Sequence, residues 1–308
     1  MKLGRTSALF VGLAALISAC GGGPGNWFGT KKTPTESGTA MLVAASFYPI
    51  AEIVQRVGGS NIDVFNLTPA GSDAHDIELS AKQLEQLSNA KITFYIGADY
   101  QPSVQKSIAT IKNMSVDLLN SLDLHTMQES GTSVKDPHVW LDPAFMIEMT
   151  RTVTDVLSAS RPELATEFGK NSSTYIAELE KLGNNIDTRF TSCESRLLIT
   201  AHSAFGYFAS RAKIDVASVA ELNPEQQLSA KQLEELAVTV KNRGVSTIFY
   251  EEMISTDLAQ TLADKAGVAT DTLNPLEGMS NADIKAGKNY ITIQEDNLNK
   301  ISKALRCS

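Results

Sequence analysis

The chain has 308 residues, 43% of them hydrophobic, and its 35 acidic and 27 basic side chains give a formal net charge of −8. No block of Lys and Arg could follow a phosphate backbone, so we expect no nucleic-acid partner. The length is sufficient for two α/β domains with their own cores, and we expect a monomer.

Residues 1–19 have the pattern of a lipoprotein signal peptide. Lys2 and Arg5 precede an apolar run that is too short to span a bilayer. The run closes on Leu-Ile-Ser-Ala-Cys20, which resembles the bacterial lipobox, where the cysteine carries the lipid. Residues 20–40, rich in Gly, Pro, Ser and Thr, predict a flexible tether. We expect an extracytoplasmic protein anchored to the membrane through Cys20; the alternative is an ordinary cleaved signal with an incidental cysteine.

An internal repeat indicates the architecture. Leu79-Ser-Ala-Lys-Gln-Leu-Glu85 recurs unchanged as Leu228-Ser-Ala-Lys-Gln-Leu-Glu234. Each copy has leucines at helical spacing and precedes a β-rich segment, at 92–96 and at 247–250. Alternating strands and helices predict an α/β fold with mostly parallel sheets. Chance similarity between two amphipathic helices is the alternative explanation.

The segment between the two copies predicts one long helix. Apolar residues in 162–192 recur at spacings of three, four and seven. We therefore expect an N-terminal α/β lobe over 41–161, a linking helix over 162–192 and a C-terminal α/β lobe over 193–308. Residues 128–135 are polar and lack periodicity, which predicts a surface loop.

Two cysteines remain once Cys20 is assigned to lipidation. Cys193 and Cys307 form an even number in an exported protein, and we expect a disulfide between them. Two buried thiols or a metal-binding pair are the alternatives.

Three of the four histidines lie in segments that suggest a metal site. His75 stands in a turn before the first repeated helix, and His138 lies in Asp136-Pro-His-Val-Trp-Leu-Asp-Pro143. His202 directly follows a predicted strand, at the end where α/β sheets place ligand contacts. Neutral imidazole is a common ligand for divalent metals, so these three together predict a metal site, although one such histidine alone would more often be structural.

We also make predictions for two further side chains near these segments. We expect Asp142 to orient an imidazole by accepting a hydrogen bond from its N–H group. His125 leads into the polar segment at 128–135 and is expected to be solvated, outside the site.

The same segments, in this order, resemble the metal-binding solute receptors of ABC importers. The resemblance extends from Leu42 to the C-terminus and is carried by the His138 segment, His202-Ser-Ala-Phe-Gly-Tyr-Phe, Phe249-Tyr-Glu-Glu and Leu273-Asn-Pro-Leu-Glu-Gly278. It implies two α/β lobes joined by a long helix, a metal in the cleft between them, and His75, His138 and His202 as ligands.

The sequence departs from the family pattern at two places. Some relatives have an aspartate where this chain has Asn274, and Glu277 resembles the glutamate that some zinc-binding relatives use as fourth ligand. Water or Asn274 are the alternatives at that position. Many zinc receptors also carry a histidine-rich loop before the His138 segment, but 127–135 contains no histidine.

Three imidazoles and one carboxylate suit four-coordinate Zn²⁺, whereas Mn²⁺ prefers more oxygen ligands. In the family, manganese receptors resemble this chain except for a carboxylate at the position of His202.

The implied function is capture of Zn²⁺ and delivery to an ABC permease with its ATPase, without catalysis. The alternatives are a manganese receptor, a zinc hydrolase with Glu251 or Glu252 as base, and a surface adhesin.

Overall fold

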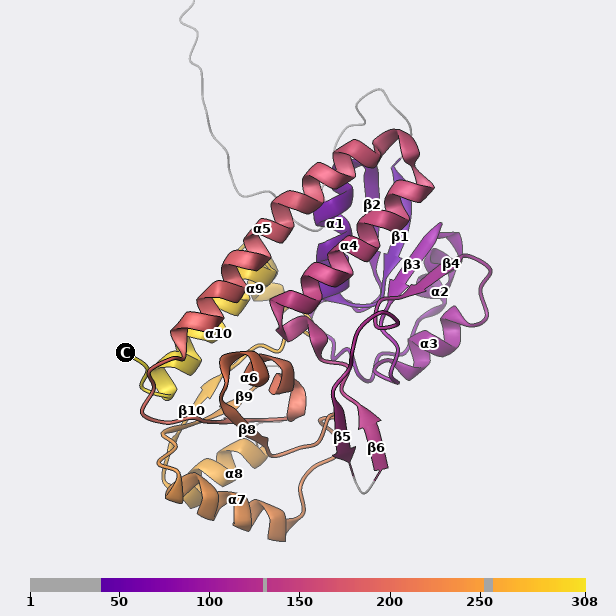
Figure 1. Ribbon diagram of the computed structural model, residues 1–308. Coiled ribbons are helices and arrows are strands. Elements are labelled where there is room, and N and C mark those ends of the chain that lie inside the picture. The colour runs from indigo at the N-terminus through magenta and orange to yellow at the C-terminus, as the bar shows by residue number, and fades with distance from the viewer. Residues whose placement is uncertain (1–39, 130–131, 252–256) are drawn as a thin grey trace, which may run out of the picture.

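The computed structural model describes residues 40–129, 132–251 and 257–308 (Figure 1). The predicted signal peptide, Cys20 and the predicted tether up to residue 39 lie outside these residues. Within them, no helix combines the length and apolar character needed to cross a bilayer. The helices and strands are, in chain order, β1 (Met41–Ala45), α1 (Tyr48–Gly58), β2 (Ile62–Asn66), α2 (Ala81–Asn89), β3 (Ile92–Tyr95), α3 (Pro102–Ile108), β4 (Met114–Asp117), β5 (Thr126–Glu129), β6 (Thr132–Lys135), α4 (Pro143–Ser160), α5 (Ala165–Arg189), β7 (Leu197–Thr200), α6 (Gly206–Ala212), β8 (Asp215–Ser218), α7 (Ala230–Asn242), β9 (Thr247–Tyr250), α8 (Asp257–Ala266), β10 (Ala269–Thr272), α9 (Asn281–Lys285) and α10 (Tyr290–Ala304).

The first lobe is built on a parallel sheet in the order β2-β1-β3-β4. Alternate residues of β1 face opposite sides, as the pleat of a strand requires. Val43 belongs to the main core cluster with residues of α1, α4 and α5, whereas Ala44 belongs to a separate cluster with Leu87 of α2 and Val104 of α3. Helices therefore cover both faces of the sheet, which explains why Val43 and Ala44, on opposite faces of β1, are both fully buried.

The second lobe repeats this plan. Strands β7 and β8 pair in parallel, β9 and β10 pair in parallel, and β7 lies against β9. The strand ends Ala45 and Thr200 are 155 residues apart (200 − 45), and so are Tyr95 and Tyr250 (250 − 95). β1 and β3 thus correspond to β7 and β9. The predicted α/β fold with mostly parallel sheets is confirmed.

A single long helix is shared by both lobes. The segment predicted as helical over 162–192 forms a short 3₁₀ turn, Pro162–Leu164, followed by α5. α5 contacts α1 and α4 of the first lobe and α6 and α10 of the second, and it extends along the molecule in Figure 1. Its buried stripe lies in a core cluster that continues from one lobe into the other.

The prediction of a surface loop over 128–135 is wrong. β5 and β6 form an antiparallel hairpin in which Met127 lies opposite Val134, and the Asp136 N–H donates to the His125 carbonyl oxygen at 3.0 Å to close its base. The hairpin extends from the body of the molecule (Figure 1). The two strands pair through backbone hydrogen bonds, which any residue can form, so the pairing does not require an apolar alternation in the sequence.

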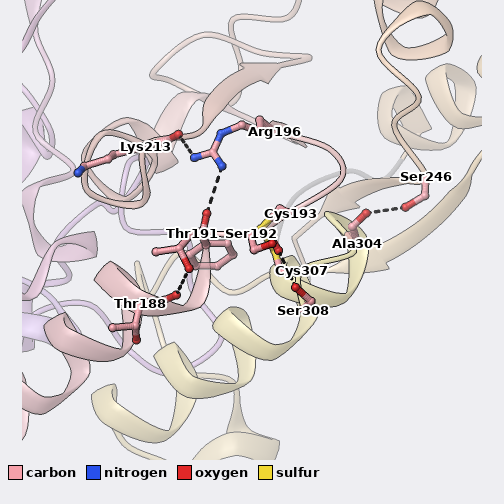
Figure 2. Close-up of a disulfide and its surroundings, with 11 residues drawn as sticks. Thr188, Thr191, Ser192, Cys193, Arg196, Lys213, Ser246, Ala304, Cys307 and Ser308 are labelled. Carbon is pink, nitrogen blue, oxygen red and sulfur yellow. Dashed lines mark hydrogen bonds between the residues drawn. A yellow bond between two sulfur atoms is a disulfide. The ribbon is translucent and has the colours of Figure 1, made fainter.

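The predicted disulfide is confirmed: Cys193 and Cys307 are bonded across 114 residues (Figure 2). The segments that carry them form a short antiparallel bridge, in which Ser195 N donates to Leu305 O at 3.1 Å and Ser308 N donates to Ser192 O at 2.9 Å. The end of α10 is thereby joined to the segment that follows α5.

The combined substitution Cys193→Ser and Cys307→Ser should lower the free energy of unfolding by about 2–4 kcal/mol, because the unfolded chain regains the freedom of a long loop. Urea unfolding of both proteins without reductant measures the difference. Wild-type protein treated with reductant should match the double variant. Equal stability of the oxidised protein and the double variant would contradict this expectation.

Candidate metal centre

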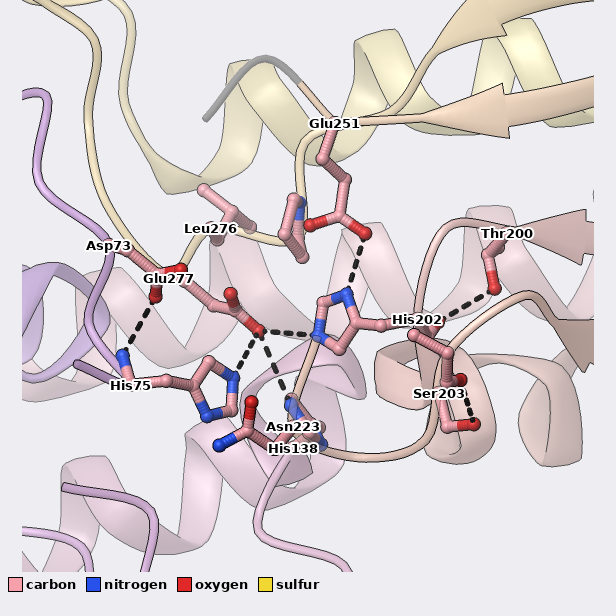
Figure 3. Close-up of polar contacts among 12 residues, drawn as sticks. Asp73, His75, His138, Thr200, His202, Ser203, Asn223, Glu251, Leu276 and Glu277 are labelled. Carbon is pink, nitrogen blue, oxygen red and sulfur yellow. Dashed lines mark hydrogen bonds and ion pairs between the residues drawn. The ribbon is translucent and has the colours of Figure 1, made fainter. Parts of the chain in front are cut away.

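Four buried side chains from four separate connections converge on one point (Figure 3). His75 lies between β2 and α2, and His138 immediately precedes a 3₁₀ turn that leads to α4. His202 follows β7, and Glu277 follows β10. One ligand atom from each lies within 4.8 Å of those of the others. The structure therefore brings together the four side chains predicted from the sequence, two from each lobe.

The spacing of these atoms suits a small cation. The Nε2 atoms of His75, His138 and His202 lie 3.3, 3.3 and 3.0 Å from Oε1 of Glu277. Zn–N and Zn–O bonds of about 2.0–2.1 Å in a tetrahedron place neighbouring ligand atoms about 3.3 Å apart. Nε2 of His138 is completely buried, and among the described residues its contact is the one at 3.3 Å with Glu277, which lacks good hydrogen-bond geometry. A buried nitrogen of this kind is a ready metal ligand.

Two buried carboxylates bind the opposite ring nitrogens. Nδ1 of His202 is 2.7 Å from Oε1 of Glu251, and Nδ1 of His138 is 2.8 Å from Oδ1 of Asp136. Such contacts direct the Nε2 atoms toward the common point. Neither contact was predicted from the sequence. The position of Asp136 two residues before His138 was an available signal, and Glu251 was proposed only as the base of a hydrolase.

The role predicted for Asp142 is wrong. Its Oδ1 accepts a hydrogen bond from Ala144 N at 2.9 Å, which caps the N-terminus of α4, and it accepts another from Arg211 Nη1 at 2.9 Å. Asp142 lies beyond the 3₁₀ turn that follows His138, so its carboxylate serves the helix, and Asp136 serves the imidazole.

The cluster is electrostatically balanced by its own members. Burial alone would raise the pKa of Glu277, but the charges of His202 and His75 and the contact with His138 hold that pKa well below its usual value. Burial alone would lower the pKa of His202, but the charges of Glu251 and Glu277 raise it well above its usual value. Asp136 and Glu277 likewise outweigh burial and raise the pKa of His138. Binding of a dication therefore competes with binding of protons at His138 and His202.

The turn that carries Glu277 is held from both lobes. Leu276 has a φ of +63°, in the left-handed region that a branched side chain rarely adopts. Asn274 Oδ1 accepts a hydrogen bond from Leu276 N at 2.8 Å, and Trp140 Nε1 donates to Pro275 O at 2.7 Å. The amide oxygen of Asn274, the alternative fourth ligand, thus supports the turn.

His125 lies outside this cluster, as predicted. Its side chain is exposed, and its ring stacks on Tyr207 with centroids 4.1 Å apart. The Tyr207 hydroxyl accepts a hydrogen bond from His125 N and donates one to Asp136 O, each at 2.9 Å. His125 therefore belongs to the base of the β5–β6 hairpin.

The arrangement is suited to holding an ion. Three imidazoles and one carboxylate fill the four positions of a tetrahedral ion, whereas catalytic zinc sites keep one position for water. The carboxylate of Glu251, one of the two bases considered for the alternative hydrolase, is engaged by His202. Glu252, the other, lies outside the described residues. The geometry therefore favours a binding site.

Comparison with known proteins identifies relatives over most of the chain. The family model "ZnuA: Zinc-uptake complex component A periplasmic" matches residues 43–304. The zinc-binding lipoprotein AdcA of Streptococcus pneumoniae R6 is 32% identical over 277 residues, which cover 85% of this chain and 55% of that protein. The chain thus spans about half the length of the first curated relatives that it matches. The high-affinity zinc uptake system protein ZnuA of Bacillus subtilis 168 is 31% identical over 318 residues, which cover 98% of each chain.

Solved structures agree with these matches. The Zn(II)-bound ZnuA-like domain of S. pneumoniae AdcA aligns with a TM-score of 0.74 and 31% identity, over 87% of this chain and 99% of that one. The laminin-binding protein Lmb of Streptococcus agalactiae, described as a bifunctional adhesin and metal transporter, aligns with a TM-score of 0.79 and 25% identity, over 86% and 100%. Because the family model covers most of the sequence and a relative matches it nearly end to end, the chain belongs to the ZnuA family of periplasmic zinc-uptake components.

Proposed function

We propose that the protein captures Zn²⁺ outside the cytoplasm and delivers it to an ABC-type permease driven by an ATPase. The observation that carries this proposal is the approach of three imidazole Nε2 atoms to Oε1 of Glu277 at 3.0–3.3 Å. His75, His138, His202 and Glu277 are the proposed ligands. The family match and the zinc-binding relatives support the same cargo.

The donor set favours zinc over manganese. Three imidazoles and one carboxylate oxygen give a compact, nitrogen-rich site, whereas Mn²⁺ favours oxygen ligands and higher coordination. A closed four-ligand site also supports binding and release of an unchanged ion rather than catalysis.

The proposal includes attachment to the membrane. Cys20, at the end of the lipobox-like segment, would carry the lipid and hold the binding lobes near the permease. The name of the AdcA relative as a lipoprotein supports this arrangement. Membrane attachment would then depend on acyl chains, since the acidic protein lacks a basic block for anionic lipid.

Substitution of any proposed ligand should weaken zinc binding by about 100-fold or more, because loss of one of four bonds should exceed the roughly 10–100-fold effect of losing an outer partner. The variants are His75→Ala, His138→Ala, His202→Ala and Glu277→Gln, and competition with a chromogenic zinc chelator measures affinity. His125→Ala is the matched control and should bind like wild type. Wild-type affinity in the four variants would exclude this site.

Zinc affinity should fall as the pH is lowered from 8 to 6. The raised pKa values of His138 and His202 mean that both rings hold protons at a higher pH than the ordinary value of about 6.5, and an ion must displace them. Glu277, whose pKa is lowered, stays ionised across this range. Calorimetric titration at pH 7 in two buffers of different ionisation enthalpy should reveal proton release. Binding without proton release and with equal affinity at pH 8 and 6 would contradict histidine ligation.

A further inference from the structure

We infer that Glu251 is a positioning residue for zinc capture, which holds the His202 ring with Nδ1 protonated so that Nε2 faces the ion. The inference rests on the proposed function and deepens it. Glu251 contacts His202, which is a proposed zinc ligand, but Glu251 itself is not one of the four proposed ligands.

The contact is short and enclosed. Oε1 of Glu251 lies 2.7 Å from Nδ1 of His202, and the two residues are 3% and 0% exposed (Figure 3). A carboxylate can only accept a hydrogen bond, so Nδ1 is the donor. Once an ion has displaced the proton on Nε2, the ring keeps its proton on Nδ1 and the lone pair belongs to Nε2, the atom that lies 3.0 Å from Oε1 of Glu277.

The backbone places both residues for this contact. His202 is the second residue after β7 and Glu251 is the first after β9, and these strands lie side by side. The hydroxyl of Thr200, the last residue of β7, donates to the His202 carbonyl oxygen at 2.8 Å. The ring and the carboxylate thus meet at the same edge of the second lobe.

The first lobe shows what the fold alone requires at these positions. Phe47 is the second residue after β1 and Ile96 is the first after β3, and each precedes its counterpart by 155 residues (202 − 47 and 251 − 96). Both side chains are fully buried and apolar. The shared scaffold therefore accepts an apolar pair where the second lobe has an imidazole and a carboxylate.

This difference identifies the purpose of Glu251. A buried carboxylate without a partner costs several kcal/mol, so the fold gains nothing from placing one there for its own sake. Glu251 is explained by its contact with His202. Its role is to fix the orientation of the ring and the position of its proton, and to make the lone pair of Nε2 a stronger ligand for the ion.

Two substitutions separate positioning from packing. Glu251→Ile reproduces the residue of the first lobe and should weaken zinc binding about 10–100-fold. Glu251→Gln keeps an oxygen that can accept from Nδ1 and should recover most of that loss. Glu234→Gln is the control, because Glu234 pairs with Lys265 on the surface of the second lobe, outside the cluster, and it should leave zinc affinity unchanged.

Proton NMR of the zinc-loaded protein supplies a readout that packing alone would not change. A strongly downfield Nδ1–H resonance of His202, assigned by its absence in His202→Ala, should be present in wild type and Glu251→Gln and lost in Glu251→Ile. If Glu251→Ile does not fold, that resonance in Glu251→Gln decides: retention supports the inference and loss overturns it.

The outcomes also distinguish this inference from the proposed function. Wild-type zinc affinity in folded Glu251→Ile, together with weak binding in His202→Ala, would overturn only the positioning role. Wild-type affinity in His202→Ala would overturn the metal site itself. Equal weakening in Glu251→Ile and Glu251→Gln, with the resonance lost in both, would show that a hydrogen-bond acceptor at this position is not sufficient to hold the ring, and would also overturn the inference.

Discussion

The contact of one buried carboxylate with three buried imidazoles is the constraint around which the molecule is organised. A charge removed from water is tolerated only when partners compensate it. Glu277 finds its partners in His75 and His138 of the first lobe and His202 of the second. Neither lobe can satisfy the cluster alone, so the site requires both lobes in their correct relative position.

The contacts that join the lobes also position the site. Trp140 follows His138 by two residues, and its indole N–H donates to the carbonyl of Pro275, which precedes Glu277 by two. The Tyr290 hydroxyl at the start of α10 donates to the Trp140 carbonyl at 2.6 Å. Each of these bonds crosses the interface at a residue two positions from a proposed ligand. The interface between the lobes and the geometry of the site therefore depend on the same contacts. Helix α5, which contacts both lobes, further stabilises their relative position.

Features that depend on local sequence patterns were predicted well, whereas contacts between segments far apart in the sequence were not. The alternation of strands and helices, the repeat and the long helix follow from periodicity, and each histidine lies in a distinctive segment. Spacing could not tell which aspartate beside His138 faces the ring, so Asp142 was chosen and Asp136 was missed. Glu251 meets His202 only because β7 lies against β9, across 49 residues of sequence. The hairpin at β5 and β6 was missed because its pairing uses the backbone and leaves no apolar pattern.

The left-handed backbone of Leu276 has a consequence for how the ion leaves. A conformation that costs about 1–3 kcal/mol persists only where its surroundings determine it, here through Asn274 and Trp140. The carboxylate beside it is thus preorganised, and an ion entering the site has little ordering entropy to overcome. The same rigidity slows departure. In the proposed function, rapid transfer of the ion to the permease would require that the permease displace this turn, which would make the Leu276 peptide the point at which release is controlled.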